Sequence, residues 1–466
     1  MKNILFISLG CDKNLVDSEK MIGLLNEAGY HLVQEEEEAD IIVVNTCCFI
    51  HDAKEESIET ILEMAEWKKK GQLKALIVTG CLAQRYQKEI QEEIPEVDAV
   101  IGTTGYTEIV PVLDAVRKKA GQNEQEAPGT IPQAKEPLLS CCPSIDKLPD
   151  SLSEKRVVTT GGYTAYLKIA EGCNKRCTYC IIPYIRGRYR SFPMEDLVKE
   201  ATLLAEGGVR ELILIAQETT VYGVDCYGKK ALPELLKKLC QIDGIEWIRL
   251  LYCYPEEITE ELIDVIRQEE KICHYLDIPI QHSEDTVLKR MGRKTNREEL
   301  ISLIHKLRRE IPDIVLRTTL ITGFPGESEE DFEHMVDFVE NMQFDRLGVF
   351  PYSAEEGTKA AEMDGQIAEE VKNSRRDAVM ALQQKISAQK ASSRIGQTMS
   401  VLIEGYLYEE DIYIGRTYMD APKVDGNVFV RSEEELISGD LVPVLITGAN
   451  EYDLIGDVIY ADEFTK

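Results

Sequence analysis

The chain has 466 residues, enough for about three domains, and 44% of them are hydrophobic, which excludes wholesale disorder. Its 83 acidic and 53 basic residues give a formal net charge of −30, which argues against a generic nucleic-acid binder because such proteins neutralise phosphates with basic surfaces. No apolar run approaches the roughly 18 residues of a membrane span, so we expect a cytoplasmic protein without a membrane partner.

The first hundred residues alternate between short apolar runs and amphipathic stretches. Apolar runs typical of strands lie at 3–9, 41–44 and 75–79. The stretches 18–28 and 54–70 place their apolar residues at helical spacing. This order predicts a βαβ series around an open parallel sheet.

Beyond this region the pattern is interrupted and then resumes. From 121 to about 154, Gln, Glu, Pro, Ser and Lys dominate without periodicity, as in a linker, and we expect Cys141 and Cys142 there to be incidental. A longer βα series, which predicts a partial (β/α)6 barrel or a wound sheet, begins near residue 163. Its expected strands are 165–170, 211–216, 247–252, 275–280, 315–321 and 346–350, and its helices are 195–206, 232–240, 256–267, 297–310 and 329–341.

The last part of the chain changes character again. After a long helical pattern at 369–394, short alternating runs with glycine turns from 397 onward predict a small antiparallel β-barrel. The chain as a whole is therefore expected to be α/β. The expected parts are an N-terminal domain at 1–118, a linker at 119–158, a central domain at 159–394 and a C-terminal barrel at 395–466.

Thirteen cysteines, an odd number in a long chain, do not indicate a disulfide framework. Three of them, Cys11, Cys47 and Cys81, each follow an expected strand of the N-terminal sheet. Parallel sheets gather ligands at the carboxyl ends of their strands, so we expect these thiols to converge, and thiolates select soft metals and iron–sulfur clusters. The alternative is three buried cysteines that happen to end strands.

A second trio lies in one loop, Cys173-Asn-Lys-Arg-Cys177-Thr-Tyr-Cys180, after the first strand of the central series. Three thiolates do not complete a four-ligand zinc site, and no fourth cysteine or histidine follows closely. A thioredoxin-like pair of Cys177 and Cys180 leaves Cys173 unexplained. A 4Fe–4S cluster with one iron not ligated by cysteine fits the spacing better, since that iron can bind a small molecule and pass it an electron.

This CxxxCxxC loop, with Tyr179 before its last cysteine, resembles the radical S-adenosylmethionine (SAM) superfamily. The resemblance implies that a 4Fe–4S cluster on Cys173, Cys177 and Cys180 binds S-adenosyl-L-methionine and that electron transfer gives a 5′-deoxyadenosyl radical. It also implies further cofactor contacts. Gln217 and Glu218 end the second central strand, where the superfamily contacts the methionine amine, although a strand-end turn is the alternative. Gly323 and Gly326 end the fifth strand, where glycines let backbone approach adenine or simply form a turn, and Tyr179 either stacks on adenine or packs.

The resemblance extends along the chain to the methylthiotransferase family. Segments 9–14, 45–47 and 79–81 are similar to its N-terminal domain, in which three cysteines hold an auxiliary 4Fe–4S cluster, and 180–183 and 186–191 match the sequence after the cluster loop. The C-terminal part resembles the family's OB-like TRAM domain. For the basic cluster of Arg186, Arg188 and Arg190 we consider two roles, which are to grip a substrate carboxylate or the cofactor, or to pair with acids such as Glu195 and Asp196.

Within this family the chain is most similar to the RimO subfamily, which methylthiolates an aspartate β-carbon in the twelfth protein of the small ribosomal subunit. The alternatives are the MiaB-like tRNA adenosine methylthiotransferases and a non-catalytic iron–sulfur scaffold or electron carrier. Residues 397–466 contain 15 acidic and 4 basic residues, a net charge of −11, which favours a basic ribosomal protein over RNA as the direct substrate. A reducing donor such as flavodoxin or ferredoxin is expected as a second partner.

Overall fold

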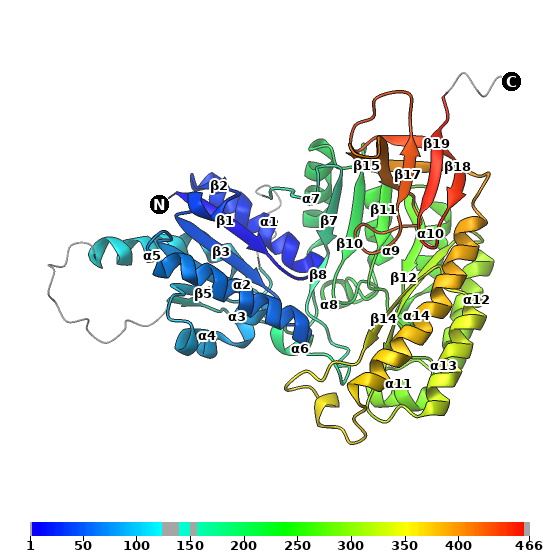
Figure 1. Cartoon of the computed structure of the whole chain (residues 1–466), viewed down its shortest axis with the longest axis horizontal. Coiled ribbons are helices and arrows are strands. Elements are labelled where there is room, and N and C mark those ends of the chain that lie inside the picture. The colour runs from blue at the N-terminus through cyan, green and yellow to red at the C-terminus, as the bar shows by residue number, and fades with distance from the viewer. Residues whose placement is uncertain (1, 124–138, 150–155, 461–466) are drawn as a thin grey trace. The chain divides into compact units, whose positions relative to one another are not determined.

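The computed structural model describes residues 2–123, 139–149 and 156–460 (Figure 1). The chain forms two compact units. Unit 1 comprises Met1–Thr159, Ala170–Arg176 and Cys180–Glu200, and unit 2 comprises Thr160–Ile169, Cys177–Tyr179 and Ala201–Lys466. The CxxxCxxC loop is divided between them, because Cys173 and Cys180 belong to unit 1 and Cys177 belongs to unit 2.

A parallel six-stranded sheet forms the centre of unit 1. Its strands are β1 (Asn3–Ser8), β2 (His31–Val33), β3 (Ile41–Thr46), β4 (Ala75–Gly80), β5 (Ala99–Ile101) and β6 (Leu139–Cys141), in the order β2-β1-β3-β4-β5-β6. Its helices are α1 (Asp12–Glu27), η1 (Glu36–Glu38), α2 (His51–Lys69), α3 (Cys81–Arg85), α4 (Gln87–Glu93), η2 (Tyr106–Glu108), α5 (Ile109–Asn123), α6 (Ile182–Ile185) and α7 (Met194–Glu206), the last continuing into unit 2. A short antiparallel ribbon joins β8 (Ala170–Glu171) to β9 (Arg190–Ser191).

The two faces of this sheet are buried in separate cores, because successive side chains of a strand point to opposite sides. Ile42 and Val44 of β3 enter a core that is completed by α2, α3 and α6. Ile41 and Val43 enter the other core, which α1 and α5 complete. Strands buried on both faces read as continuous apolar runs, which explains why β3 and β4 are visible in the sequence.

Two of the differences between the structure and the sequence-based expectation in unit 1 have a clear physical reason. Helix α1 begins at Asp12 rather than at residue 18, because its first turns bury polar side chains such as Asn14 and Asp17 and therefore lack apolar periodicity. Strand β6 lies inside the expected linker and pairs in parallel with β5. With three residues it is too short to give a sequence signal. The rest of the expected loop at 124–138 and 150–154 lies outside the described residues.

Unit 2 contains a second parallel sheet, whose strands follow one another in chain order and alternate with helices, as the expected partial (β/α)6 barrel requires. Its strands are β7 (Thr164–Lys168), β10 (Glu211–Ile215), β11 (Trp247–Leu250), β12 (Ile272–Asp277), β13 (Val315–Thr322) and β14 (Arg346–Pro351). Its helices are α8 (Val224–Tyr227), α9 (Leu232–Cys240), η4 (Pro255–Glu257), α10 (Glu260–Gln268), α11 (Asp285–Met291), α12 (Arg297–Glu310), α13 (Glu329–Met342), η5 (Ala360–Glu362) and α14 (Glu369–Ser392). Helix α10 starts later than expected, because Thr259 caps it by accepting a hydrogen bond from the Leu262 N–H at 3.2 Å.

A closed barrel, drawn in orange to red in Figure 1, ends the described chain. Its strands are β15 (Thr398–Leu407), β16 (Ile412–Arg416), β17 (Val428–Arg431), β18 (Leu441–Ala449) and β19 (Leu454–Val458), in the order β15-β16-β17-β19-β18. The β17–β19 pair is parallel, whereas the other pairs are antiparallel as expected. A ring of five strands cannot alternate direction all the way round, so one parallel pair is unavoidable.

Buried ion pairs join this barrel to the central sheet within unit 2. Glu211 of β10 accepts Arg249 Nε at 2.8 Å and Arg416 Nη2 at 2.7 Å, and all three side chains are almost fully buried. Burial alone would raise the pKa of Glu211, but the charges of Arg416 and Arg249 outweigh it and lower that pKa to about 2. Arg416 also donates through Nε to Glu404 of β15 at 2.7 Å, which extends the network into the barrel.

The described part of the chain contains no helix that is both long and apolar enough to cross a membrane.

Candidate functional site

Three thiols meet at the carboxyl edge of the unit 1 sheet, as the sequence predicts. Cys11 precedes α1, Cys47 follows β3 and Cys81 opens α3 directly after β4. Their proximity is visible at Gly10, which has a φ of +88°, and where an added Cβ would lie 2.9 Å from Cys47 Sγ. Burial, followed by the neighbouring Cys81 and Cys11, raises the pKa of Cys47 to about 12. Two buried thiols, Cys47 and Cys81, and the exposed Cys11 at one sheet edge suit a bound metal centre, because its positive charge stabilises the thiolate form.

Polar side chains that the sequence analysis did not single out fix this edge. Asn14 Nδ2 donates to Leu9 O at 3.1 Å and to Thr46 O at 2.9 Å, which ties together the ends of β1 and β3. Ser57 of α2 accepts a hydrogen bond from Cys47 N at 3.0 Å and donates one to Cys47 O at 2.9 Å. The backbone that carries Cys47 is therefore held on both of its polar groups.

A buried arginine also contacts this edge. Arg186 donates through Nη1 to Asp17 Oδ2 at 2.8 Å and lies 3.4 Å from a Glu171 oxygen. Its Nη2 donates to Asn14 Oδ1, which also accepts a hydrogen bond from Cys81 Sγ at 3.7 Å. Burial raises the pKa of Cys81, whereas the charge of Arg186 lowers it. Of the two roles considered for this arginine, the structure shows pairing with acids, and these acids are Asp17 and Glu171.

Two cysteines of the second trio lie in unit 1. Cys173 is buried, and its N–H donates to Gly187 O at 3.2 Å, so the loop runs against the segment that follows it. Asn174 Oδ1 accepts a hydrogen bond from Tyr189 N at 3.1 Å, which fixes the same two segments to each other. The Lys175 N–H donates a hydrogen bond to Cys173 Sγ at 3.5 Å. Cys180 is partly exposed.

Cys177 lies in unit 2 and is buried there beside an aromatic and a cationic side chain. Its Sγ is 3.8 Å from Tyr254 Oη, and the Arg293 guanidinium lies over the Tyr254 ring at 4.3 Å. Burial lowers the pKa of Arg293, but Tyr179, Tyr254 and Cys177 raise it above its ordinary value. Nε and Nη1 of Arg293 are buried and donate to no described protein atom, so this side chain has donors available for an anion. Tyr254 and Arg293 were missed because single residues after a strand and a helix give no pattern.

Gln217 and Glu218, the residues expected to contact the methionine amine, lie just after β10. Glu218 is connected through Thr220 to Tyr254, the neighbour of Cys177. Glu218 is buried, and its Oε1 accepts the Thr220 N–H at 3.1 Å. Thr220 Oγ1 in turn accepts a hydrogen bond from Tyr254 N at 3.3 Å. Gln217 Oε1 is buried and accepts no hydrogen bond from the residues that the structure describes. A buried acceptor of this kind fits an ammonium ligand.

Tyr179 and the glycine turn after β13 lie together in unit 2. The Tyr179 ring contacts Phe324 edge-on, with the ring centroids 6.4 Å apart. Gly323 and Gly326 have φ of +70° and +85°, and an added Cβ would lie 2.2 Å from Lys372 Cγ and 2.7 Å from Arg290 Cζ, respectively. The positive φ favours glycine at both positions, and at Gly323 close packing against Cβ and Cγ of Lys372 also requires it.

A carboxylate under this turn holds its backbone in place. Glu327 Oε2 accepts the Gly323 N–H at 2.8 Å and the Phe324 N–H at 3.3 Å. Its Oε1 accepts Arg375 Nη1 of α14 at 2.6 Å, and His282 Nε2 lies 3.4 Å from Oε2. The turn is thereby connected to α14.

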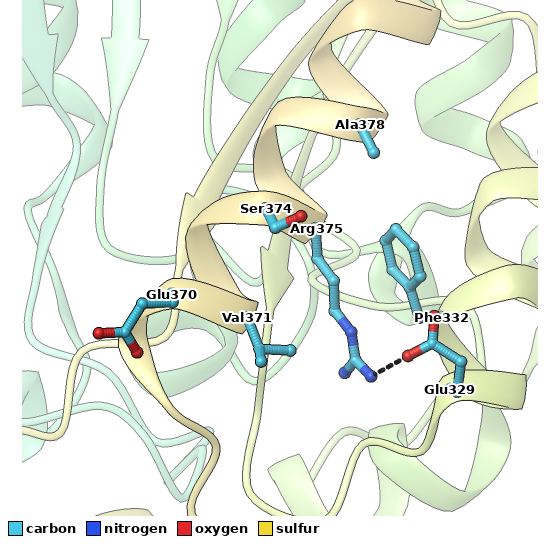
Figure 2. A pocket seen from close by; sticks show the side chains of 7 residues that line it. All are labelled: Glu329, Phe332, Glu370, Val371, Ser374, Arg375 and Ala378. Atoms are coloured by element: carbon cyan, nitrogen blue, oxygen red, sulfur yellow. Dashed lines mark hydrogen bonds and ion pairs between the residues drawn. The ribbon is translucent and has the colours of Figure 1, made fainter.

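The same arginine lines a surface hollow between α13 and α14. Figure 2 shows its side chain beside Phe332 and joined to Glu329, with an Nη2–Oε2 distance of 2.8 Å. The guanidinium lies over the Phe332 ring at 5.2 Å. The lining of this hollow includes no cysteine, and one of its two acidic residues, Glu329, is paired with Arg375, so we assign it a structural part rather than a catalytic one. Its lining residues are Glu329, Phe332, Glu370, Val371, Ser374, Arg375 and Ala378.

Family models match the three parts of the chain in order. They are "Uncharacterized protein family UPF0004" at 3–102, "Radical SAM superfamily" at 167–339 and "TRAM domain" at 395–459. Among solved structures, the radical S-adenosylmethionine methyltransferase TsrM from Kitasatospora setae is similar with a TM-score of 0.54 and 14% identity, covering 86% of this chain and 78% of that one. At that identity the likeness concerns the fold, and it agrees with the expected α/β architecture.

Relatives of known name match almost the full length. A protein of Lachnoclostridium phytofermentans is 63% identical over 97% of this chain and 99% of its own. Proteins of Clostridioides difficile and Thermoanaerobacter sp. are each 51% identical, over 99% and 98% of this chain and 99% and 100% of their own. All three are named ribosomal protein uS12 methylthiotransferase RimO. This chain therefore belongs to the RimO family of radical SAM methylthiotransferases.

Proposed function

We propose that the chain methylthiolates an aspartate β-carbon of ribosomal protein uS12 with the help of two 4Fe–4S clusters. The observation that carries this proposal is the pair of cysteine trios, Cys11, Cys47 and Cys81 at one sheet edge and Cys173, Cys177 and Cys180 in one loop, in a chain 63% identical to a protein named for this activity. Three thiolates leave one iron of a 4Fe–4S cluster without a protein ligand. When bound, the loop cluster supplies the electron that cleaves S-adenosylmethionine, and the auxiliary cluster supplies an open iron for sulfur.

The unit 2 residues are proposed to bind and orient S-adenosylmethionine. Gln217 and Glu218 present acceptors to the amine, as expected from the sequence. Arg293 offers buried donors beside Cys177 and can hold a carboxylate. Tyr179 and the Gly323–Gly326 turn are proposed to cover adenine, with Tyr179 providing an aromatic face. Glu218 and Arg293 are buried, and low dielectric strengthens the contacts that these two residues make.

The C-terminal barrel is proposed to favour a basic partner. Residues 397–466 have a net charge of −11, which complements a ribosomal protein and repels RNA phosphates. The relatives' names refer to uS12, and on that ground we also propose a cytoplasmic location. The electron donor is proposed to be a flavodoxin or a ferredoxin.

The test is mass spectrometry after anaerobic incubation of the reconstituted enzyme with S-adenosylmethionine and a reductant. Purified uS12 is expected to gain a methylthio group, whereas tRNA is expected to stay unmodified. Modification of tRNA alone would overturn the proposed substrate in favour of the MiaB-like alternative. Absence of 5′-deoxyadenosine would exclude the radical reaction and favour a non-catalytic iron–sulfur scaffold or electron carrier.

Variants separate the two cysteine trios. C81A removes an auxiliary ligand, so this variant should still form 5′-deoxyadenosine but should not methylthiolate uS12. C226A changes an exposed cysteine outside both trios and is the matched control, which should retain both products. If C81A no longer forms 5′-deoxyadenosine although its loop trio holds iron normally, the proposal that the two trios have separate functions is contradicted.

A further inference from the structure

Arg186 occupies an unusual place for a structural arginine. It follows α6 in the segment after the CxxxCxxC loop and is 2% exposed. Its partners lie elsewhere in unit 1, with Asp17 and Asn14 on α1 and Glu171 on β8. A guanidinium does not lose its proton at any working pH, so this position carries a permanent positive charge in a mostly buried environment.

That charge acts on the auxiliary cysteines. Arg186 shares the acceptor Asn14 Oδ1 with the Cys81 thiol, so a single side chain separates its guanidinium from an auxiliary cysteine. Low dielectric makes such a charge more effective than it would be in water. The fixed positive charge of Arg186 therefore lies beside the auxiliary trio.

A second buried arginine in the same unit, Arg156, forms ion pairs with two carboxylates and serves as a comparison for Arg186. Arg156 is fully buried and donates to Glu19 Oε2 at 2.6 Å and to Glu200 Oε1 at 2.8 Å. Its pKa is set by burial and by those two carboxylates, with no cysteine among its main interactions. Arg186 also lies between two carboxylates, but it additionally contacts the group that bonds Cys81. The two arginines therefore differ in that Arg186 lies close to a cysteine thiol of the auxiliary trio.

We propose that Arg186 is a positioning residue of the auxiliary centre, which supplies the fixed positive charge that stabilises the additional electron of the reduced cluster. This inference rests on the proposed function, in which Cys11, Cys47 and Cys81 hold a 4Fe–4S cluster. Positive charge near a cluster favours its reduced form, so removal of Arg186 makes reduction harder. Removal of the negative charge of Asp17, which lies 2.8 Å from Arg186, has the opposite effect.

The experiment uses the full chain with C173A, C177A and C180A, so that only the auxiliary trio can hold a cluster. This parent and its variants are reconstituted anaerobically with iron and sulfide and titrated with dithionite in the presence of mediators, and the reduced cluster is followed by electron paramagnetic resonance. At the midpoint potential of the parent, R186Q should lower the ratio of reduced to oxidised cluster about tenfold, a shift of about 59 mV to lower potential. D17N should raise the ratio. R186K, which keeps the charge, and R156Q, the buried control, should match the parent.

The outcomes discriminate clearly. If R186Q and D17N both keep the parent's midpoint potential, the inference is overturned even when their iron content is normal. If R186Q takes up no iron, D17N decides, because a positive shift supports the inference and an unchanged potential refutes it. If R156Q shifts the midpoint potential as far as R186Q does, the shift follows from the loss of any buried charge in the unit. The proposed positioning role of Arg186 is then refuted. If the parent itself takes up no iron, the proposed auxiliary cluster is refuted, and with it this inference.

Discussion

The E211Q substitution tests how strongly the barrel is fixed to the central sheet. Glu211 is the shared acceptor of Arg249 and Arg416, and E211Q leaves two buried guanidinium groups close together without their carboxylate. Removing one partner of a buried ion pair typically costs about 3–5 kcal/mol. The pKa of Glu211 gives a similar figure, since lowering it from 4.5 to about 2 corresponds to about 3 kcal/mol of stability near neutral pH.

The expected result is a lower and less pH-dependent melting temperature. At roughly 2–3 °C per kcal/mol for a domain of this size, E211Q should lower the Tm of the unit 2 transition by roughly 6–15 °C. Because the folded-state pKa of Glu211 is depressed, its contribution is fully present above about pH 4.5 and is lost as the pH falls towards about 2. The difference between wild type and E211Q should therefore shrink over that range.

Anaerobic differential scanning calorimetry at pH 7 and at lower pH measures both effects. The matched control is E234Q, the same substitution in the exposed pair of Glu234 with Lys229, whose N–O distance is 3.0 Å. That variant should leave the Tm unchanged, because solvent screens an exposed pair. Equal Tm values for E211Q and E234Q would refute the view that the buried network stabilises the barrel.

Three further predictions concern the radical site. C177A should abolish 5′-deoxyadenosine formation, measured by chromatography, because the loop cluster loses a ligand. R293Q should reduce 5′-deoxyadenosine formation at least tenfold, equivalent to about 1.4 kcal/mol, since a buried cation beside Cys177 is lost. G326A should lower the Tm and weaken S-adenosylmethionine binding in equilibrium dialysis, because the new Cβ would meet Arg290 Cζ at 2.7 Å on a backbone with φ of +85°. The backbone part of that cost is about 1–2 kcal/mol.

Each of these variants has a control that isolates the cause. C226A, at an exposed cysteine, should keep 5′-deoxyadenosine formation, and R309Q, at an exposed arginine of α12, should behave as wild type. G162A has the same φ of +85° with no atom within 4 Å of the added Cβ, so it pays only the backbone cost. Normal product in C177A or R293Q, or equal effects of G326A and G162A, would contradict the corresponding prediction.

The architecture could be predicted because its strongest signals are local. Strands such as β3 and β4 are buried on both faces and appear as continuous apolar runs, and the long helices α12 and α13 show clear periodicity. The convergence of Cys11, Cys47 and Cys81 followed from parallel topology, and the three thiols do meet at one edge. The cofactor roles of the six cysteines and of the SAM-contacting residues stay predictions, as do the domain limits.

Other parts of the site could not be predicted, because they depend on contacts between distant segments. The polar start of α1 buries Asn14 and Asp17 against Arg186, more than 160 residues later, and no periodicity reveals such a pairing. Tyr254, which follows β11, and Arg293, which lies between α11 and α12, approach Cys177 from separate connections. Glu195 and Asp196 lie near Arg186 in the sequence, whereas Asp17 and Glu171 lie near it in space and are its partners.

The composition of unit 1 bears on how the chain matures during synthesis. Its core includes Ile181 and Ile185, and its buried Lys20 pairs with Glu200 at 3.3 Å, so the N-terminal sheet is completed by residues that are translated much later. Folding of this unit cannot finish until Glu200 has left the ribosomal tunnel. A protein fragment that ends at Thr159 would lack Ile181, Ile185 and Glu200, so its core would be incomplete and Lys20 would lose its partner. This unit therefore cannot be transferred to another protein as one continuous N-terminal segment.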